Sequence, residues 1–180
     1  MKSHWTTWFL VATSVAWTTP MAAQSLQRWS VQGVGVYVIR RAAGSNDVTE
    51  NRRRAGGEAQ LRYTFNLSRL SIGLGYQESV VRSGFVEPRV VVAANERIAL
   101  YFSGRAGLAK LVCGAGAECA PQKLEQLLGI GGGGLFQVND RLAVDLGALY
   151  YFTYYTPFGQ VGLRSRSGWA QLRFGFGVGL

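Results

Sequence analysis

Apolar and polar residues alternate along most of the chain after residue 23. In residues 58–66, Leu61, Tyr63 and Phe65 occupy every second position, and Arg62 and Thr64 lie between them. A strand points successive side chains to opposite faces, so a period of two predicts β-strands. The pattern recurs in eight segments, which are residues 29–39, 58–66, 69–77, 84–92, 97–109, 124–138, 141–152 and 169–180.

The links between these segments alternate in length. Tight turns rich in Asn, Asp and Ser are expected at 66–69, 93–96 and 139–140. Mostly longer, polar links are expected at 40–57, 79–83, 110–123 and 153–167. Short turns at one end, longer loops at the other and an even number of strands predict an all-β fold. The predicted fold is an eight-stranded antiparallel up-and-down transmembrane β-barrel with short periplasmic turns and longer extracellular loops.

The two faces of the predicted strands differ in side-chain size. One set contains large apolar residues, and the other is rich in glycine and polar residues. An eight-stranded barrel is just wide enough inside for side chains. We therefore expect the apolar set to face lipid, including Val34, Val36 and Val38 of the first segment. The alternative is a soluble, secreted eight-stranded barrel in which the apolar set lines a ligand cavity.

The first 23 residues have a different pattern. Lys2 and His4 form a basic start, an apolar stretch follows, and the small residues Ala22 and Ala23 come next. This order is typical of a secretory signal peptide. We expect a signal peptide over residues 1–23 and an outer-membrane barrel domain over 24–180. The alternative is an uncleaved anchor, but the apolar stretch is shorter than the ~20 residues that a spanning helix needs.

Composition supports a single folded β domain. Of 180 residues, 48% are hydrophobic, only 16% are charged and 24 are glycine. Disorder requires low hydrophobicity and high charge, so it is excluded. The glycines argue against a helical protein, because each glycine in a helix costs about 1 kcal/mol relative to alanine. The net charge of +9 raises the possibility of nucleic-acid binding, which depends on where the charges lie.

One group of charged residues lies within the strands, on the face opposite the large apolar set. Four acids and four arginines share that face, and we expect them to pair in the lumen and leave no open pore. A narrow, gated ion path remains the alternative. The residues of this predicted lumen network are Glu58, Arg62, Glu87, Arg89, Arg105, Glu125, Asp145 and Arg173.

A second group consists of arginines in the predicted loops. On the outer face they would meet the phosphates of lipopolysaccharide, which arginine pairs with in a bidentate manner. A solvated loop without a dedicated ligand is the alternative. The positive excess lies in loops of an exported protein, so we expect no nucleic-acid partner. The loop arginines are Arg40, Arg41, Arg52, Arg53, Arg54, Arg82, Arg164 and Arg166.

Three runs of sequence carry a resemblance to a known family. They are LGIGGGGLFQVNDRLAVDLGALYYF at 128–152, VEPR at 86–89 and LRFGFGVGL at 172–180. They resemble the small outer-membrane β-barrel domains of the OmpA/OmpX type. The resemblance implies a Gram-negative outer-membrane location, contact with membrane lipid, and the barrel-assembly machinery as a partner during biogenesis. It also implies a structural or surface-interaction role, such as envelope integrity, adhesion or surface binding, and we expect a monomer.

Catalysis, a cofactor and a metal site are not expected. Enzymatic barrels that resemble this one use a histidine base, and the only histidine here, His4, lies in the predicted signal peptide. The spacing Gly129-x-Gly131-x-x-Gly134 matches a dinucleotide fingerprint, but a strand-like stretch and a turn follow it instead of a helix. We expect these glycines to relieve crowding inside a narrow barrel. With no histidine and two cysteines, a zinc site is not expected.

The two cysteines fall in one predicted loop. Cys113 and Cys119 are separated by five residues. An exported protein with an even number of cysteines predicts a disulfide, which would stiffen this loop. Two free thiols are the alternative.

Overall fold

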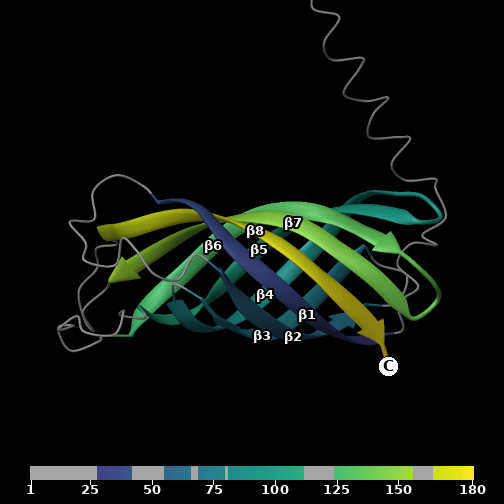
Figure 1. Cartoon of the computed structure of the whole chain (residues 1–180), viewed down its shortest axis with the longest axis horizontal. Coiled ribbons are helices and arrows are strands. Elements are labelled where there is room, and N and C mark those ends of the chain that lie inside the picture. Colours follow the sequence, from purple (N-terminus) through teal and green to yellow (C-terminus); the bar gives the residue numbers. More distant parts are fainter. Residues whose placement is uncertain (1–27, 42–54, 66–68, 80, 112–123, 156–163) are drawn as a thin grey trace, which may run out of the picture.

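Eight antiparallel strands form a closed barrel in the computed structural model (Figure 1). The structure describes residues 28–41, 55–65, 69–79, 81–111, 124–155 and 164–180. Each strand pairs with its neighbours in sequence, and β1 pairs with β8 to close the sheet. The strands are β1 (Trp29–Arg41), β2 (Ala55–Thr64), β3 (Leu70–Glu78), β4 (Val81–Ala94), β5 (Ile98–Leu111), β6 (Glu125–Gln137), β7 (Leu142–Tyr155) and β8 (Arg164–Gly179).

The predicted eight-stranded antiparallel barrel is confirmed. Different strand connections lie at the two ends of the barrel. At one end, here called the turn end, β2 connects to β3, β4 to β5 and β6 to β7. The end of β8 also lies there, because the Leu180 amide donates to the Trp29 carbonyl at 2.9 Å. The opposite end is called the loop end. No described residue belongs to a helix long and apolar enough to cross a membrane.

Most strands are longer at the loop end than the alternation predicts. Backbone pairing continues past the alternating residues, as in the Arg164–Tyr155 and Arg40–Ala170 pairs. The assignment of five arginines to loops is therefore wrong, since their backbones belong to β1, β4 and β8. These residues are Arg40, Arg41, Arg82, Arg164 and Arg166.

The link between β3 and β4 is shorter than expected. Only Ser79 and Val80 separate the two strands, because β4 begins at Val81. The Ser79 amide donates to the Val81 carbonyl at 3.0 Å, which closes the connection. The expected link over 79–83 is therefore largely strand. The other three predicted long links fall mainly outside the described residues.

Side chains alternate between the outer surface and the lumen. Outside, Leu74 and Phe102 are 65% and 66% exposed. Inside, Gln77, Glu87 and Asp145 have no exposed surface. In the middle of the barrel, large apolar side chains therefore face outward and charged side chains face the lumen.

Strand β1 is the exception to the expected orientation. Val34, Val36 and Val38 are buried, whereas Tyr37 and Ile39 are about half exposed. The prediction that these valines face lipid is wrong. Val38 belongs to an apolar cluster inside the barrel, so packing in the lumen determines which face of β1 points inward.

Two apolar clusters lie inside the barrel on either side of its charged middle. The turn-end cluster contains Val91, Ala99 and Tyr101, with Ala94 and Leu135 packed against it. The loop-end cluster consists of Val38, Val81, Ala109, Leu127, Leu149, Tyr151 and Trp169. The rings of Tyr151 and Trp169 stack with their centroids 5.0 Å apart. The charged side chains between the two clusters are buried.

Glycines in β6 allow its close contact with β7. A Cβ atom on Gly131 would lie 2.2 Å from the Ala148 carbonyl oxygen, and one on Gly133 would lie 2.3 Å from that of Leu146. Real Cβ atoms do not approach other atoms so closely. The expectation that glycines relieve crowding therefore has a geometric basis at Gly131, and Gly133 is a second such position, which was not singled out from the sequence.

We predict that Gly131→Ala lowers the free energy of unfolding by about 1–3 kcal/mol, because the new methyl group overpacks the β6–β7 contact. Urea unfolding in detergent, followed by tryptophan fluorescence, measures this change. Gly57→Ala is the matched control, since a Cβ there has no atom within 4 Å. Equal free energies for the two variants would contradict the close contact.

Candidate functional site

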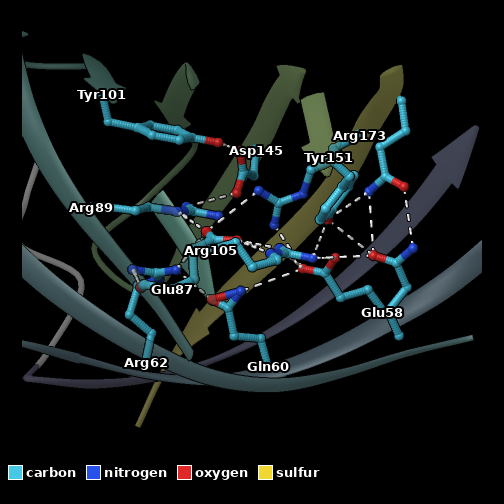
Figure 2. A network of polar contacts seen from close by, with 12 residues as sticks. Glu58, Gln60, Arg62, Glu87, Arg89, Tyr101, Arg105, Asp145, Tyr151 and Arg173 are labelled. Atoms are coloured by element: carbon cyan, nitrogen blue, oxygen red, sulfur yellow. Dashed lines mark hydrogen bonds and ion pairs between the residues drawn. The ribbon is translucent and has the colours of Figure 1, made fainter. Parts of the chain in front are cut away.

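Seven charged side chains from five strands meet in the middle of the lumen (Figure 2). Each points inward because it occupies an inward position of the strand alternation, and each is buried. They are Glu58 and Arg62 of β2, Glu87 and Arg89 of β4, Arg105 of β5, Asp145 of β7 and Arg173 of β8. We call these residues the lumen network.

Glu87 is the centre of this network. Its Oε1 atom lies 2.9 Å from Arg62 Nη2, 2.6 Å from Arg89 Nε and 3.4 Å from Arg173 Nη1. Its Oε2 atom accepts hydrogen bonds from Arg105 Nε, at 2.8 Å, and from Arg105 Nη2. One carboxylate therefore receives donors from all four arginines of the network, and such charge-assisted bonds are stronger than neutral ones.

Glu58 binds two of the same arginines from the other side. Its two oxygens accept from Arg105 Nη1 at 2.8 Å and from Arg105 Nη2 at 3.0 Å. Arg173 Nη2 donates to the same carboxylate at 2.7 Å. Arg105 is thereby held between two carboxylates, which fixes the plane of its guanidinium group.

Asp145 connects the network to the turn-end cluster. Its Oδ2 atom lies 2.8 Å from Arg89 Nη1. Its Oδ1 atom accepts a hydrogen bond of 2.6 Å from the Tyr101 hydroxyl. The Arg89 guanidinium carbon also lies 4.3 Å from the centre of the Tyr101 ring, a cation–π contact.

Neutral polar groups continue the network toward the loop end. Arg105 Nη1 donates to the Tyr151 hydroxyl at 2.6 Å and to the Gln77 side-chain oxygen at 3.1 Å. Gln171 Nε2 donates to the Tyr151 hydroxyl at 3.1 Å. The Arg105 guanidinium carbon lies 3.6 Å from the centre of the Phe85 ring. Polar and aromatic side chains thus fill the space around the charges.

The structure brings together seven of the eight residues expected in the lumen. The exception is Glu125, whose backbone pairs with Ala109 at the start of β6 and whose side chain lies outside the described part. The sequence did not predict that Tyr101 and Tyr151 form hydrogen bonds with the lumen network. Their inward positions in the alternation were visible, but an aromatic residue is common on either face of such a barrel.

The structure describes the side chain of one predicted loop arginine, Arg82. Arg82 is exposed, and its Nη2 atom lies 2.9 Å from Glu78 Oε1. The side chains of Arg40, Arg41, Arg164 and Arg166 lie outside the described part, as do Arg52, Arg53 and Arg54 and both cysteines, Cys113 and Cys119.

The arrangement of the lumen network is suited to holding the barrel together. Each of its carboxylates is occupied by arginine donors, and it contains no histidine or cysteine. In the described ranges, no group of three or more His, Cys, Asp or Glu residues could hold a metal ion. The network links strands from different sides of the barrel through its interior.

We predict that Glu87→Gln lowers the free energy of unfolding by about 3–5 kcal/mol, because it leaves buried arginines without their common carboxylate. Urea unfolding in detergent micelles measures the change.

Glu78→Gln is the matched control, since it removes the carboxylate of an exposed ion pair and should change the free energy by less than about 1 kcal/mol. Small, equal effects of both substitutions would mean that water enters the lumen and screens its charges.

No protein-family model matches this sequence, and no curated protein matches it. Solved structures do. Neisserial surface protein A is 15% identical, with a TM-score of 0.61 over 86% of this chain and 98% of that one. Outer membrane protein H of Pseudomonas aeruginosa is 14% identical, with a TM-score of 0.53 over 84% of this chain and 98% of that one.

A third similar structure is the N-terminal β-barrel domain of OprF from Pseudomonas aeruginosa. It is 13% identical, with a TM-score of 0.51, and the match covers 84% of this chain and 98% of that one. At these identities the likeness concerns the fold. The chain has the fold of the small eight-stranded outer-membrane β-barrels.

Proposed function

We propose that this chain is an integral protein of a bacterial outer membrane with a structural or surface-interaction role and without catalysis. The observation that carries the proposal is the combination of an apolar outer surface with a filled, charged lumen. The similar fold of proteins described as outer-membrane or surface proteins supports it.

Large apolar side chains are exposed on every strand of the barrel. Monomeric soluble proteins rarely expose contiguous apolar patches of more than a few hundred Å². A surface of this kind fits the hydrocarbon of a bilayer, where strands can cross only as a closed barrel. One such side chain from each strand in turn is Val31, Leu61, Leu74, Val90, Phe102, Ile130, Leu146 and Phe174.

Aromatic side chains lie near both ends of the apolar surface. At the turn end, the Tyr63 ring lies 4.9 Å from that of Trp29 and 5.1 Å from that of Phe65, measured between centroids. Toward the loop end, Tyr37 and Tyr76 are about half exposed. Aromatic girdles at the two membrane interfaces are typical of outer-membrane barrels.

The filled lumen argues against both alternatives. A soluble ligand-binding barrel needs an apolar cavity, but the middle of this lumen holds paired charges. An ion path needs hydrated polar groups along its whole length, but apolar clusters lie on either side of the network. We propose a closed barrel whose function resides at its surfaces.

The proposal also covers export and partners. Residues 1–23 would act as a signal peptide, the barrel-assembly machinery would insert the chain, and it would act as a monomer. At the loop end, arginines such as Arg52, Arg53 and Arg54 would contact lipopolysaccharide phosphates. Arg82 contributes less to this contact, because it already pairs with Glu78.

We predict that Phe174→Lys makes folding into lipid bilayers less favourable by about 2–4 kcal/mol, because the lysine charge would lie in the hydrocarbon. Glu96→Lys, at an exposed turn position, is the control and should have little effect. Phe174→Lys without effect, together with recovery of the native chain as a monodisperse soluble protein, would contradict membrane insertion.

We also predict that the purified barrel gives no stable conductance steps in planar lipid bilayers, because the lumen network and the two apolar clusters fill the interior. Large, stable steps would show that the lumen conducts and would favour the pore alternative.

A further inference from the structure

Four arginines occupy equivalent positions at the turn end of the barrel. Each is the residue directly before an odd-numbered strand, and we call the four together the arginine ring. The members are Arg28 before β1, Arg69 before β3, Arg97 before β5 and Arg141 before β7. None of the four belongs to the lumen network or to the predicted loop arginines.

The backbone fixes all four positions in the same way. The carbonyl group of each arginine accepts a hydrogen bond from an amide of the next or closing strand, at 2.7–2.8 Å. The donors are Thr64 for Arg28, Val91 for Arg69, Gln137 for Arg97 and Gly179 for Arg141. The ring is therefore attached to the last paired residues of the sheet and follows the rim of the barrel.

Two members of the ring lie in matching turns with the order Asn, acid, Arg, apolar. In the first turn, Asn95 Oδ1 accepts from the amides of Arg97 at 3.0 Å and Ile98 at 2.7 Å. An asparagine that caps following amides fixes a tight turn. The same contacts, both 2.9 Å long, join Asn139 to Arg141 and Leu142.

The ring lies directly beside the apolar surface. Trp29 and Leu70, which follow Arg28 and Arg69, are exposed on the outside of the barrel. Since a strand rises about 3.3 Å per residue, each arginine backbone lies just beyond the edge of the apolar surface. Long arginine side chains place their charge at such an interface while their stems stay on apolar surface.

The charges of three members of the ring, Arg69, Arg97 and Arg141, are available for a ligand. Among the residues that the structure describes, Arg69, Arg97 and Arg141 form no ion pair with a carboxylate. The nearby acids, Glu96 and Asp140, are exposed. Each lies one residue before the arginine in its turn and is therefore one residue farther from the next strand. The arginines are therefore the charged residues nearest to the apolar surface at the starts of β5 and β7.

We propose that the arginine ring binds the phosphate groups of anionic phospholipids in the leaflet at the turn end, and so sets the depth of the barrel in the membrane. A planar guanidinium group pairs with phosphate oxygens in a bidentate manner. The inference rests on the proposed membrane insertion and adds the class of lipid and the residues that bind it.

Trp29 provides a reporter at this end of the barrel. In residues 24–180 the only other tryptophan is Trp169, which is buried in the loop-end cluster. A Trp169→Phe background therefore leaves Trp29 as the single tryptophan of residues 24–180. Arg69 and Arg141 precede β3 and β7, each two strands from β1 around the barrel, a separation of about 10 Å.

The experiment reconstitutes residues 24–180 with Trp169→Phe into phosphatidylcholine vesicles that contain a small fraction of lipid brominated on its acyl chains. Quenching of Trp29 by brominated phosphatidylglycerol is compared with quenching by brominated phosphatidylcholine. We expect phosphatidylglycerol to be enriched about two- to five-fold near Trp29. In the double variant Arg69→Gln/Arg141→Gln the enrichment should fall by more than half. In the protein with the arginine ring intact, about 0.5 M NaCl should also reduce the enrichment, because salt screens surface charges.

Two further variants test where the effect originates. Arg82→Gln/Lys110→Gln removes two charges near the loop end and should leave the enrichment unchanged. Arg69→Lys/Arg141→Lys keeps the charge and should retain most of the enrichment, even if the glutamine variant fails to fold. Equal quenching by the two lipids, or an enrichment that both glutamine pairs reduce alike, would contradict phospholipid binding by the arginine ring. Absence of quenching by either lipid would instead contradict membrane insertion itself.

Discussion

The contact between Glu87 and four arginines is the constraint on which the rest of the barrel depends. An eight-stranded barrel has room inside for side chains and little else. A carboxylate in that space needs donors, and each buried guanidinium group needs acceptors. The network meets both needs by drawing side chains from β2, β4, β5, β7 and β8 to one place (Figure 2). Strands on opposite sides of the lumen are thus connected through it.

The outer surface follows from this interior. Because successive side chains of a strand point to opposite faces, strands with charged residues inward present their other set outward. That set is large and apolar, so water is a poor solvent for it and lipid is a good one. The same alternation that builds the network therefore creates the membrane-facing surface, and the arginine ring lies where that surface ends.

The period of two in the sequence was enough to predict the number of strands and the inward face of Glu87, Arg105 and Asp145. It could not decide the orientation of β1, because Val34, Val36 and Val38 alternate with residues that are small or amphipathic, and either set fits a lumen. The sequence could not predict which charged side chains pair in the lumen. Pairing depends on the stagger between strands, because the stagger determines which side chains lie at the same level of the barrel.

The positions of Arg82 and of the arginine ring became clear only from the pairing of the strands. Arg82 reads as a loop residue in a polar stretch, but pairing between β3 and β4 continues to Glu78 and makes it part of a strand. The repeated order Asn, acid, Arg is visible at 95–97 and 139–141 in the sequence. Only the common hydrogen bonds to neighbouring strands show that Arg28 and Arg69 occupy the same rim positions.

The central claim is that the lumen network is closed to water and that each of its carboxylates is paired with arginine. Solvent exchange of the arginine Nε protons, measured by NMR in detergent micelles, tests it most directly. Arg89 and Arg105 donate their Nε protons to Glu87, whereas Arg82 donates its own to Glu78 at the exposed surface. The account predicts that the Nε protons of Arg89 and Arg105 exchange far more slowly than that of Arg82. Equal exchange rates for the three would show that water reaches the network and would contradict a closed barrel.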